Sequence, residues 1–145
     1  MTEYYTDGSA SPNPGVGGYA VIKNGLPYLI GGEPSGEETT NIRMEGLAIK
    51  AALEDAAGEP CEIKTDSEFW VNVLTKWAPI WESDGWYKKG GIKNLDIVQA
   101  LHELYQASQA QLTWTQGHVG TELNELADEW ANHARASGVT EPIKI

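Results

Sequence analysis

The sequence predicts an α/β protein in which a mixed β-sheet is covered by helices. Turn signals divide the chain into three strands, a helix, a strand, further helices, a strand and a last helix, and this order is typical of such a sheet. Of the 145 residues, 41% are hydrophobic, which is enough for a packed core. No repeat, low-complexity tract or long linker interrupts the chain, so we expect one domain over residues 1–145.

The first three strands are predicted to form a local antiparallel meander, at residues 2–6, 19–23 and 28–30. The first of them is rich in Tyr and Thr, and Asp7-Gly8-Ser9 predicts its end. Two prolines within residues 11–15 fix φ and allow no strand there. The other two strands flank Asn24-Gly25, a strong hairpin signal because both residues can adopt a positive φ.

The rest of the chain is predicted to alternate between helix and strand. The expected elements are a helix at 43–57, a strand at 61–65, a helix from 66 to about 77, a helix at 95–107, a strand at 111–115 and a helix from about 122 to 138. The first of these helices is dense in Ala, Leu, Ile and Lys, with Asn41 as its expected N-cap. Gly58 and Pro60 stop it.

Composition limits the setting in which the chain works. No apolar run approaches the ~20 residues of a membrane helix, and Met1 to Glu3 do not begin a secretory leader. A single cysteine, Cys61, cannot form an internal disulfide and excludes a four-thiolate metal site. We therefore expect a cytoplasmic protein without a membrane partner.

The net charge argues against a nucleic-acid partner when it is taken alone. The chain has 10 basic and 21 acidic residues, a net charge of −11, and binding to a polyanion normally depends on a surplus of Lys and Arg. Three of the basic residues are nevertheless close together in the sequence: Lys88, Lys89 and Lys93. Net charge does not describe the local field around such a group.

Four of the acidic residues fall where acids are not expected to be fully solvated. Asp7 and Asp66 follow the first and fourth predicted strands, and ligands collect just beyond the carboxyl ends of strands in open sheets. Glu45 has Ala48, Ile49 and Ala52 at i+3, i+4 and i+7, which places it on an apolar stripe. Asp128 lies in the first turns of the last helix, beside its apolar stripe.

Two interpretations of these acids are open. Each aspartate alone is more often a solvated turn former, and Glu45 could lie at the edge of its stripe. If the four carboxylates converge, however, their repulsion requires a cation to neutralise them. Oxygen ligands without His or Cys select Mg²⁺ or Mn²⁺, and a pair of such ions supports in-line attack on a phosphodiester.

Five short motifs occur in order along nearly the whole chain: Asp7-Gly8-Ser9 with Asn13-Pro14-Gly15, Arg43-Met44-Glu45, Thr65-Asp66-Ser67, Gly117-His118-Val119-Gly120, and Asn124 with Ala127-Asp128. On these motifs the chain resembles ribonuclease H type 1. The resemblance implies the RNase H-like fold, a five-stranded mixed sheet in the order 3-2-1-4-5 with helices on both faces. It also implies a Mg²⁺-dependent endonuclease that cleaves the RNA strand of RNA–DNA hybrids and leaves 5′-phosphate and 3′-hydroxyl ends. We expect the chain to act as a monomer.

The resemblance assigns catalytic roles residue by residue. Asp7, Glu45, Asp66 and Asp128 match the ligands of two Mg²⁺ ions, for which Mn²⁺ can substitute, and Asp7 would bridge both ions. One ion would activate a water molecule and the other would stabilise the departing 3′-oxygen. His118 matches a histidine on a mobile loop that helps to move protons or release product.

The resemblance also implies a set of substrate contacts: Asn13, Thr40, Asn41, Arg43, Thr75, Trp86, Lys88, Lys89 and Lys93. Asn13 and Asn41 match positions that face the minor groove of the hybrid, and Arg43 matches a position that holds a DNA phosphate. The alternative for Arg43 is a salt bridge on the helix surface. For Trp77 and Trp81, at i, i+4 spacing, we favour a hydrophobic packing cluster over a contact with the substrate.

The chain departs from the family pattern at three places. Glu68 stands where a Gln is usual, Ile42 stands where a second Asn is common, and residues 82–89 are less basic than the family's protrusion. Two other functions compete with ribonuclease H: another nuclease on the same fold, such as a resolvase, and an inactive hybrid-binding module. The Asn13, Asn41 and Arg43 set argues against the first, and the presence of all four carboxylates argues against the second.

Overall fold

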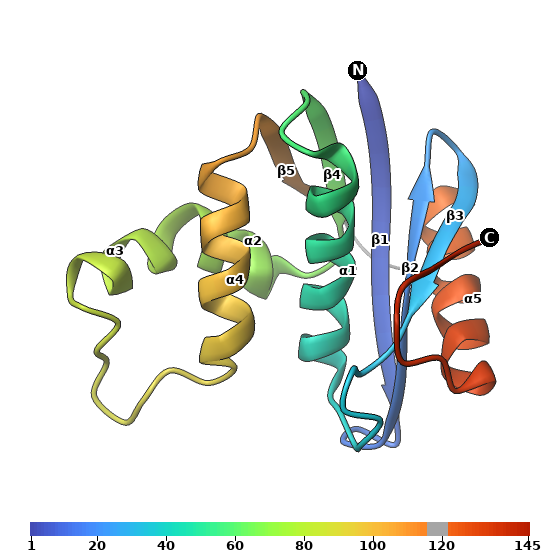
Figure 1. Cartoon of the computed structure of the whole chain (residues 1–145), viewed down its shortest axis with the longest axis horizontal. Helices are drawn as coiled ribbons and strands as arrows, with labels where there is room; N and C mark the ends of the chain where they lie inside the picture. The colour runs from blue at the N-terminus through green and yellow to red at the C-terminus, as the bar shows by residue number, and fades with distance from the viewer. Residues whose placement is uncertain (116–121) are drawn as a thin grey trace.

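A computed structural model describes residues 1–115 and 122–145, and its centre is a mixed sheet in the order β5-β4-β1-β2-β3-β6 (Figure 1). The strands are β1 (Thr2–Ser11), β2 (Val16–Lys23), β3 (Leu26–Gly31), β4 (Cys61–Thr65), β5 (Ala110–Trp114) and β6 (Ile143–Lys144). The helices are α1 (Asn41–Ala56), α2 (Glu68–Asn72), η1 (Val73–Trp77), α3 (Ala78–Ser83), α4 (Leu95–Gln106) and α5 (Glu122–Ser137).

The predicted strand order is confirmed, and a sixth strand extends it. β1 pairs antiparallel with β2 and parallel with β4, and β5 continues the parallel side. β6 adds to the free edge of β3 through the pairs Leu29↔Lys144 and Ile30↔Ile143. The expectation of five strands was therefore incomplete, because a two-residue strand is too short to show an alternating pattern in the sequence.

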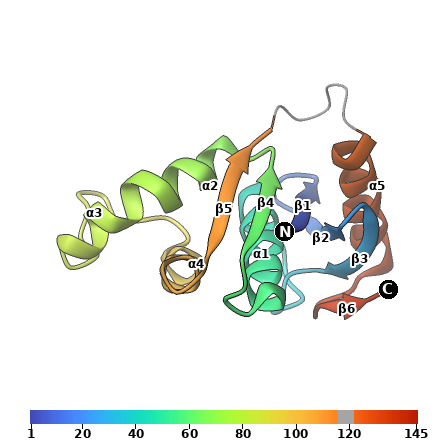
Figure 2. The same ribbon diagram turned by 90° about the horizontal axis from the view of Figure 1, so that it is seen from above.

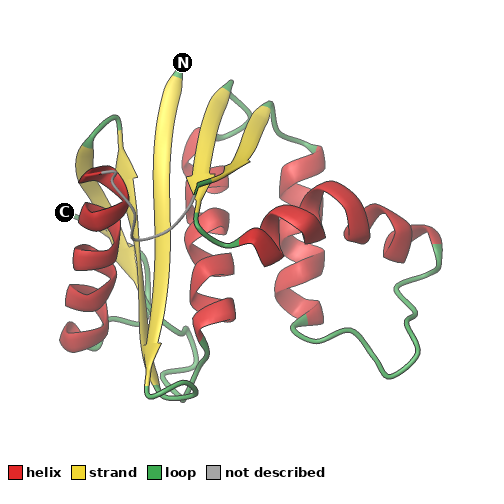
Figure 3. Cartoon of the chain, turned by 180° about the vertical axis from the view of Figure 1, so that it is seen from behind, coloured by secondary structure: helices red, strands yellow, loops and turns green. Residues whose placement is uncertain are grey.

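Helices cover both faces of the sheet. α1 packs on β1 and β2 from one side and α4 packs beside it, whereas α5 covers β1 and β2 from the other side (Figures 1 and 3). Successive residues of a strand point to opposite faces, so Tyr4 belongs to the core under α1 and Tyr5 to the core under α5. Both tyrosines are buried. None of the helices in the two described ranges is long and apolar enough to cross a membrane.

β1 is longer than the sequence predicts. Its pairing with β2 continues to Ser11↔Val16, so Asp7-Gly8-Ser9 does not end the strand. The ladder to β2 supplies hydrogen bonds that override the turn tendency of these residues. The parallel pairing with β4 stops at Thr6↔Thr65, however. Asp7 and Asp66 are therefore the next residues after the last parallel pair, which brings them side by side as the strand-end prediction required.

Gly8 lets α1 approach β1 closely. A Cβ atom built on Gly8 would lie 2.3 Å from the Glu45 nitrogen and 2.3 Å from the Met44 carbonyl carbon, both of them backbone atoms. Only glycine leaves room for this contact. The absence of a side chain at Gly8 thus brings Glu45 to the strand that carries Asp7.

The helix after β4 extends further than predicted. Ser67 caps α2, and the chain then continues through the π-helical turn η1 into α3, so it is helical to Ser83 rather than to about Trp77. A segment with positive φ at its glycines follows, and we call residues 85–94 the lysine loop. Figure 2 shows α3 and this loop extending away from the sheet, beyond β5.

Candidate metal centre and nucleic-acid groove

Three of the predicted metal ligands meet at the centre of the sheet. Asp7, Glu45 and Asp66 each offer a carboxylate oxygen, and these oxygens all lie within 4.8 Å of one another. They come from β1, α1 and the residue after β4. Asp7 is 7% exposed, and the other two are partly buried. The cluster is therefore recessed but reachable from solvent.

Burial and mutual repulsion make these carboxyl groups hard to ionise. Burial, followed by the charges of Asp66 and Asp128, raises the pKa of Asp7 to about 9. Burial and the charge of Asp66 also raise the pKa of Glu45 to about 7, although a hydrogen bond with Ser67 acts in the opposite direction. A divalent cation would remove both costs, and a set of carboxylate oxygens fits Mg²⁺ or Mn²⁺.

Asp128 and His118 complete the predicted catalytic set, with different outcomes. Asp128 lies partly buried in the first half of α5, outside the group within 4.8 Å, and its charge nevertheless contributes to the raised pKa of Asp7. Asp128 is therefore close enough to Asp7 for their charges to interact, but it is not part of the group of three carboxylates within 4.8 Å. His118 falls within residues 116–121, outside the described part of the chain.

Trp114 supports the site and was missed by the sequence analysis. Its indole Nε1 donates a hydrogen bond of 3.1 Å to the backbone carbonyl of Asp66. The backbone nitrogen of Thr115 donates a second hydrogen bond, of 2.8 Å, to the Thr65 carbonyl. Two consecutive residues at the end of β5 therefore hold Thr65 and Asp66 at the end of β4. Trp114 is 45% exposed at the end of β5 and is 48 residues away from Asp66 in the sequence, so no local pattern could have indicated this contact.

Two predicted asparagines lie together at the start of α1. The side-chain oxygen of Asn41 accepts a 2.6 Å hydrogen bond from the Ala10 nitrogen, and that of Asn13 accepts a 3.2 Å bond from the Asn41 nitrogen. Both amide groups therefore present their NH₂ donors away from these bonds. The N-cap of α1 is Thr40, whose hydroxyl accepts from the Arg43 nitrogen, so the expectation of Asn41 as N-cap was wrong.

A groove with aromatic and basic walls lies next to α1. Its volume is about 600 Å³, and its walls include Ile42, Trp77, Trp81, Lys88, Lys89 and Lys93. The rings of Trp77 and Trp81 are 6.1 Å apart, and the Lys88 ammonium lies 5.7 Å from the Trp81 ring centre. The expected packing cluster is confirmed, because Trp77 also contacts the ring of Phe69 and Trp81 packs against the core. The same two tryptophans also line the groove.

Trp86 lies elsewhere. Its ring packs edge-on against the buried His102, with 5.5 Å between the ring centres, and it lines a separate hollow between α3 and α4. Trp86 is partly buried and packs against the main core. The substrate contact expected for Trp86 therefore has no support from its position, which is outside the groove.

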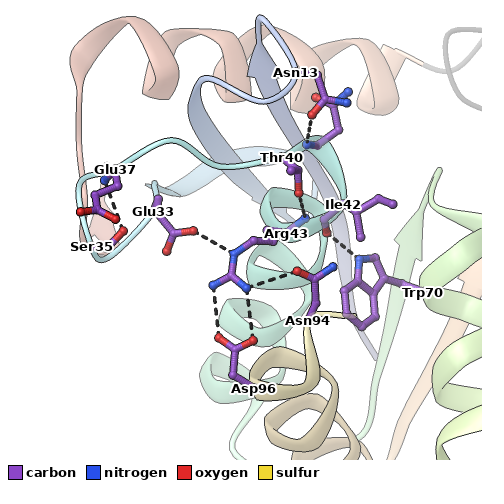
Figure 4. A network of polar contacts seen from close by, with 11 residues as sticks. Asn13, Glu33, Ser35, Glu37, Thr40, Ile42, Arg43, Trp70, Asn94 and Asp96 are labelled. Atoms are coloured by element: carbon purple, nitrogen blue, oxygen red, sulfur yellow. Dashed lines mark hydrogen bonds and ion pairs between the residues drawn. The ribbon is translucent and has the colours of Figure 1, made fainter. Parts of the chain in front are cut away.

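Thr75 and Arg43 already have protein partners. The exposed Thr75 hydroxyl donates a 2.6 Å bond to the Val71 carbonyl in the preceding turn. The Arg43 guanidinium is bonded to Glu33, Asn94 and Asp96 (Figure 4). Arg43 thus has the ion pairs that were the alternative to a phosphate contact.

An acidic cluster at the centre of a mixed sheet, with a groove of lysines and aromatic rings on the same molecule, is compatible with a metal-dependent nuclease. Comparison with known proteins agrees. A family model described as RNase H matches residues 1–136. The chain therefore belongs to the RNase H family of hydrolases.

Relatives at the sequence and structure levels show the extent of the likeness. Ribonuclease HI of Pseudomonas aeruginosa is 41% identical over 139 residues, an alignment that covers 91% of each chain. Ribonuclease H of Mesorhizobium japonicum is 42% identical over 143 residues, covering 94% of this chain and 78% of that protein. The structure of LC9-RNase H1, a type 1 RNase H with the type 2 active-site motif, superposes with a TM-score of 0.82. It is 24% identical, covers 99% of this chain and 77% of that one, and shows the shared fold.

Proposed function

We propose that this chain is a Mg²⁺-dependent endoribonuclease that hydrolyses the RNA strand of RNA–DNA hybrids and leaves 5′-phosphate and 3′-hydroxyl ends. The observation that carries the proposal is the convergence of Asp7, Glu45 and Asp66 within 4.8 Å. Membership of the RNase H family supports the hybrid as substrate. We place the enzyme in the cytoplasm and expect it to act as a monomer.

The carboxylates hold the metal in this proposal. Asp7, Glu45 and Asp66 would bind two Mg²⁺ ions together with Asp128, and Asp7 would contact both. Bound Mg²⁺ would supply Lewis-acid activation of the attacking water and stabilisation of the leaving 3′-oxygen. The chain contributes a rigid frame, because β1, β4 and the close contact of Gly8 with α1 fix the ligands before metal binds. His118 would help to move protons or release product.

Asn13 and Asn41 fit recognition of the minor groove. Purine N3 and pyrimidine O2 are acceptors that every base pair presents in the minor groove, and RNA adds 2′-hydroxyl groups. Two NH₂ donors held by backbone hydrogen bonds therefore match a duplex without demanding a particular sequence. Lys88, Lys89 and Lys93 would hold the phosphates of the DNA strand, with Trp77 and Trp81 against its sugars.

The test of the activity compares end-labelled RNA–DNA hybrid, duplex DNA and duplex RNA of one sequence, each with Mg²⁺ and with EDTA. We expect Mg²⁺-dependent cleavage of the RNA strand of the hybrid alone, with 5′-phosphate ends. Cleavage of duplex DNA at a similar rate would favour the resolvase-like alternative. Binding of the hybrid without cleavage in Mg²⁺ or Mn²⁺ would favour the inactive module.

The groove is tested by the paired change Lys88→Ala with Lys89→Ala. Each phosphate contact adds about 0.7–0.9 to the slope of log affinity against log salt, so the pair should raise KM and flatten that slope while kcat stays near the parent value. The matched control is Lys50→Ala with Lys144→Ala, which removes the same charge from residues outside the groove. Equal effects of the two pairs would refute the groove as the site of the DNA strand.

A further inference from the structure

Arg43 joins three segments that are far apart in the sequence. It lies in the first turn of α1, and its Nε donates to a Glu33 carboxylate oxygen at 2.9 Å, in the segment after β3. Its Nη1 and Nη2 donate to the two oxygens of Asp96, both at 3.2 Å, in the first turn of α4. Nη1 also donates to the side-chain oxygen of Asn94 at 3.3 Å. Figure 4 shows the guanidinium at the centre of this network.

These contacts leave the guanidinium little capacity to bind a phosphate. Four hydrogen bonds use most of its N–H donors, and the two-point contact with Asp96 matches the planar fork of arginine. The Glu33 side chain is 10% exposed and the Arg43 side chain 24%, so this ion pair is shielded from solvent. Taking Arg43 away would leave the Glu33 carboxylate recessed without its partner, which is costly.

Arg43 holds the end of the lysine loop. Asn94 is the last loop residue, adopts a left-handed conformation with φ 57, and precedes α4. Inside the loop Gly90 and Gly91 have positive φ, and a hydrogen bond from the Gly91 nitrogen to the Lys88 carbonyl closes a turn. The loop is thus held at its α4 end by side chains, and Arg43 supplies three of those hydrogen bonds through Asn94 and Asp96.

Lys93 immediately precedes this anchor. It lines the groove of Trp77 and Trp81, and it also lines a second hollow of about 570 Å³ shared with Asn13 and Thr40. Lys93 is therefore the lysine common to the groove for the DNA strand and to the hollow that Asn13 lines near the start of α1. Its place depends on the position of Asn94.

We propose that Arg43 is a positioning residue, which fixes the α4 end of the lysine loop so that Lys93 faces the path of the nucleic acid between the two hollows. Arg43 acts on the substrate through Lys93 and does not itself hold a phosphate. The proposal rests on the proposed function for its kinetic consequences, but the bracing of the loop can be measured without any substrate.

The kinetic test compares Arg43→Ala, Arg43→Lys, Lys93→Ala and the double variant Arg43→Ala with Lys93→Ala. Each single change should raise KM for the hybrid about threefold to tenfold, as expected for one phosphate contact, with kcat unchanged at saturating Mg²⁺. Arg43→Lys should be as impaired as Arg43→Ala, because an ammonium keeps the charge but cannot make the forked contact with Asp96. The double variant should be no worse than Lys93→Ala.

A direct phosphate contact by Arg43 predicts the opposite pattern. Arg43→Lys would keep the parent's KM and salt slope, and the effects of Arg43→Ala and Lys93→Ala would multiply in the double variant. Asp96→Ala gives a further contrast, since it would free Arg43 and tighten binding under direct contact but weaken binding if Arg43 is a brace. Asp84→Ala is the control, because it removes an acidic charge just before the lysine loop in the sequence and Asp84 makes no hydrogen bond to Arg43.

Amide hydrogen exchange tests the brace independently of activity. Exchange in residues 85–94 should become faster in Arg43→Ala and Arg43→Lys and stay at the parent rate in Lys93→Ala, while exchange in β1 and β2 stays unchanged in all three. Unchanged exchange in the loop of Arg43→Ala would overturn the proposal. If the parent chain fails to cleave hybrids, the proposed function fails while this measurement still decides whether Arg43 braces the loop.

Discussion

The buried Asp7 carboxyl gives a sharp test of the metal centre. Burial, with the charges of Asp66 and Asp128, raises its pKa from 3.8 to about 9, so the folded chain without metal holds this group protonated at pH 7. The unfolded chain ionises it, and folding therefore takes up a proton. For an acid with a raised pKa, stability is greatest below pH 4 and falls as the pH rises towards about 9.

The size of the effect follows from the pKa values. At pH 7 the interval from 3.8 covers about 3 pH units at about 1.4 kcal/mol each, which gives an upper bound of about 4 kcal/mol. Asp7→Asn keeps the shape and removes the titration, so we expect the metal-free variant to be more stable than the parent at pH 7 to 9 but not at pH 4. Each 1 kcal/mol corresponds to about 2–4 °C in Tm for a chain of this size.

The assay is thermal unfolding in EDTA at three pH values, followed by turnover in Mg²⁺. Asp84→Asn makes the same chemical change at an exposed position and should leave Tm unchanged. Asp7→Asn should lower turnover at least about a thousandfold, because a metal ligand accounts for several kcal/mol of transition-state stabilisation. A lower Tm than the parent in EDTA at pH 7 to 9, or turnover within about tenfold of the parent, would refute the reasoning.

Three other predictions follow from contacts in the fold. Gly8→Ala places a Cβ 2.3 Å from the Glu45 nitrogen, so the free energy of unfolding in urea should fall by about 1–3 kcal/mol and turnover should also fall. A variant with the stability and the turnover of the parent would contradict the close packing of α1 on β1. Burial acts to raise the pKa of Asp55, but hydrogen bonds from two tyrosines and a lysine lower it to about 2. Asp55→Ala should cost about 2–3 kcal/mol at neutral pH, and this difference should shrink as the pH falls from about 4 towards 2; a constant difference would contradict the charge-assisted bonds. Trp114→Phe removes the bond to the Asp66 carbonyl and should raise the Mg²⁺ concentration for half-maximal activity about fivefold; an unchanged Mg²⁺ titration would exclude this support.

Local signals in the sequence predicted most of the sheet and the acidic cluster. The Asn24-Gly25 hairpin and the alternation in β4 depend on neighbouring residues only. The predicted strand at 61–65 agrees with the structure, and the helix predicted from about 122 to 138 is α5, Glu122–Ser137. Each aspartate alone looked like an ordinary turn former. Asp7, Glu45 and Asp66 were recognisable as a set, because two predicted strand ends and an apolar helix face could bring their carboxylates together. Their convergence then followed from the strand order.

Non-local contacts explain the errors. The end of β1 depends on its ladder with β2, which lies outside the Asp7-Gly8-Ser9 signal, and β6 exists only because β3 has a free edge. The i, i+4 spacing of Trp77 and Trp81 shows that they share a helix face. That face packs as expected, with Trp81 against the core and Trp77 against Phe69. It also lines a groove because residues of the lysine loop form the other wall, which no periodic pattern encodes.

The lysine loop concentrates basic residues at one place on an acidic molecule, which affects the orientation in which a nucleic acid would approach. The net charge of the chain is −11, while three of its ten basic residues stand on a segment that extends away from the sheet (Figure 2). At physiological salt, charges are felt over about 8 Å, so a duplex near a face with an excess of acidic residues would meet repulsion before it makes contact. Under the proposed function, collisions with such a face would be short-lived, and the excess of acid would favour approach at the lysine loop. Making the rest of the surface more basic would increase the number of encounters and reduce the fraction that reach the carboxylates.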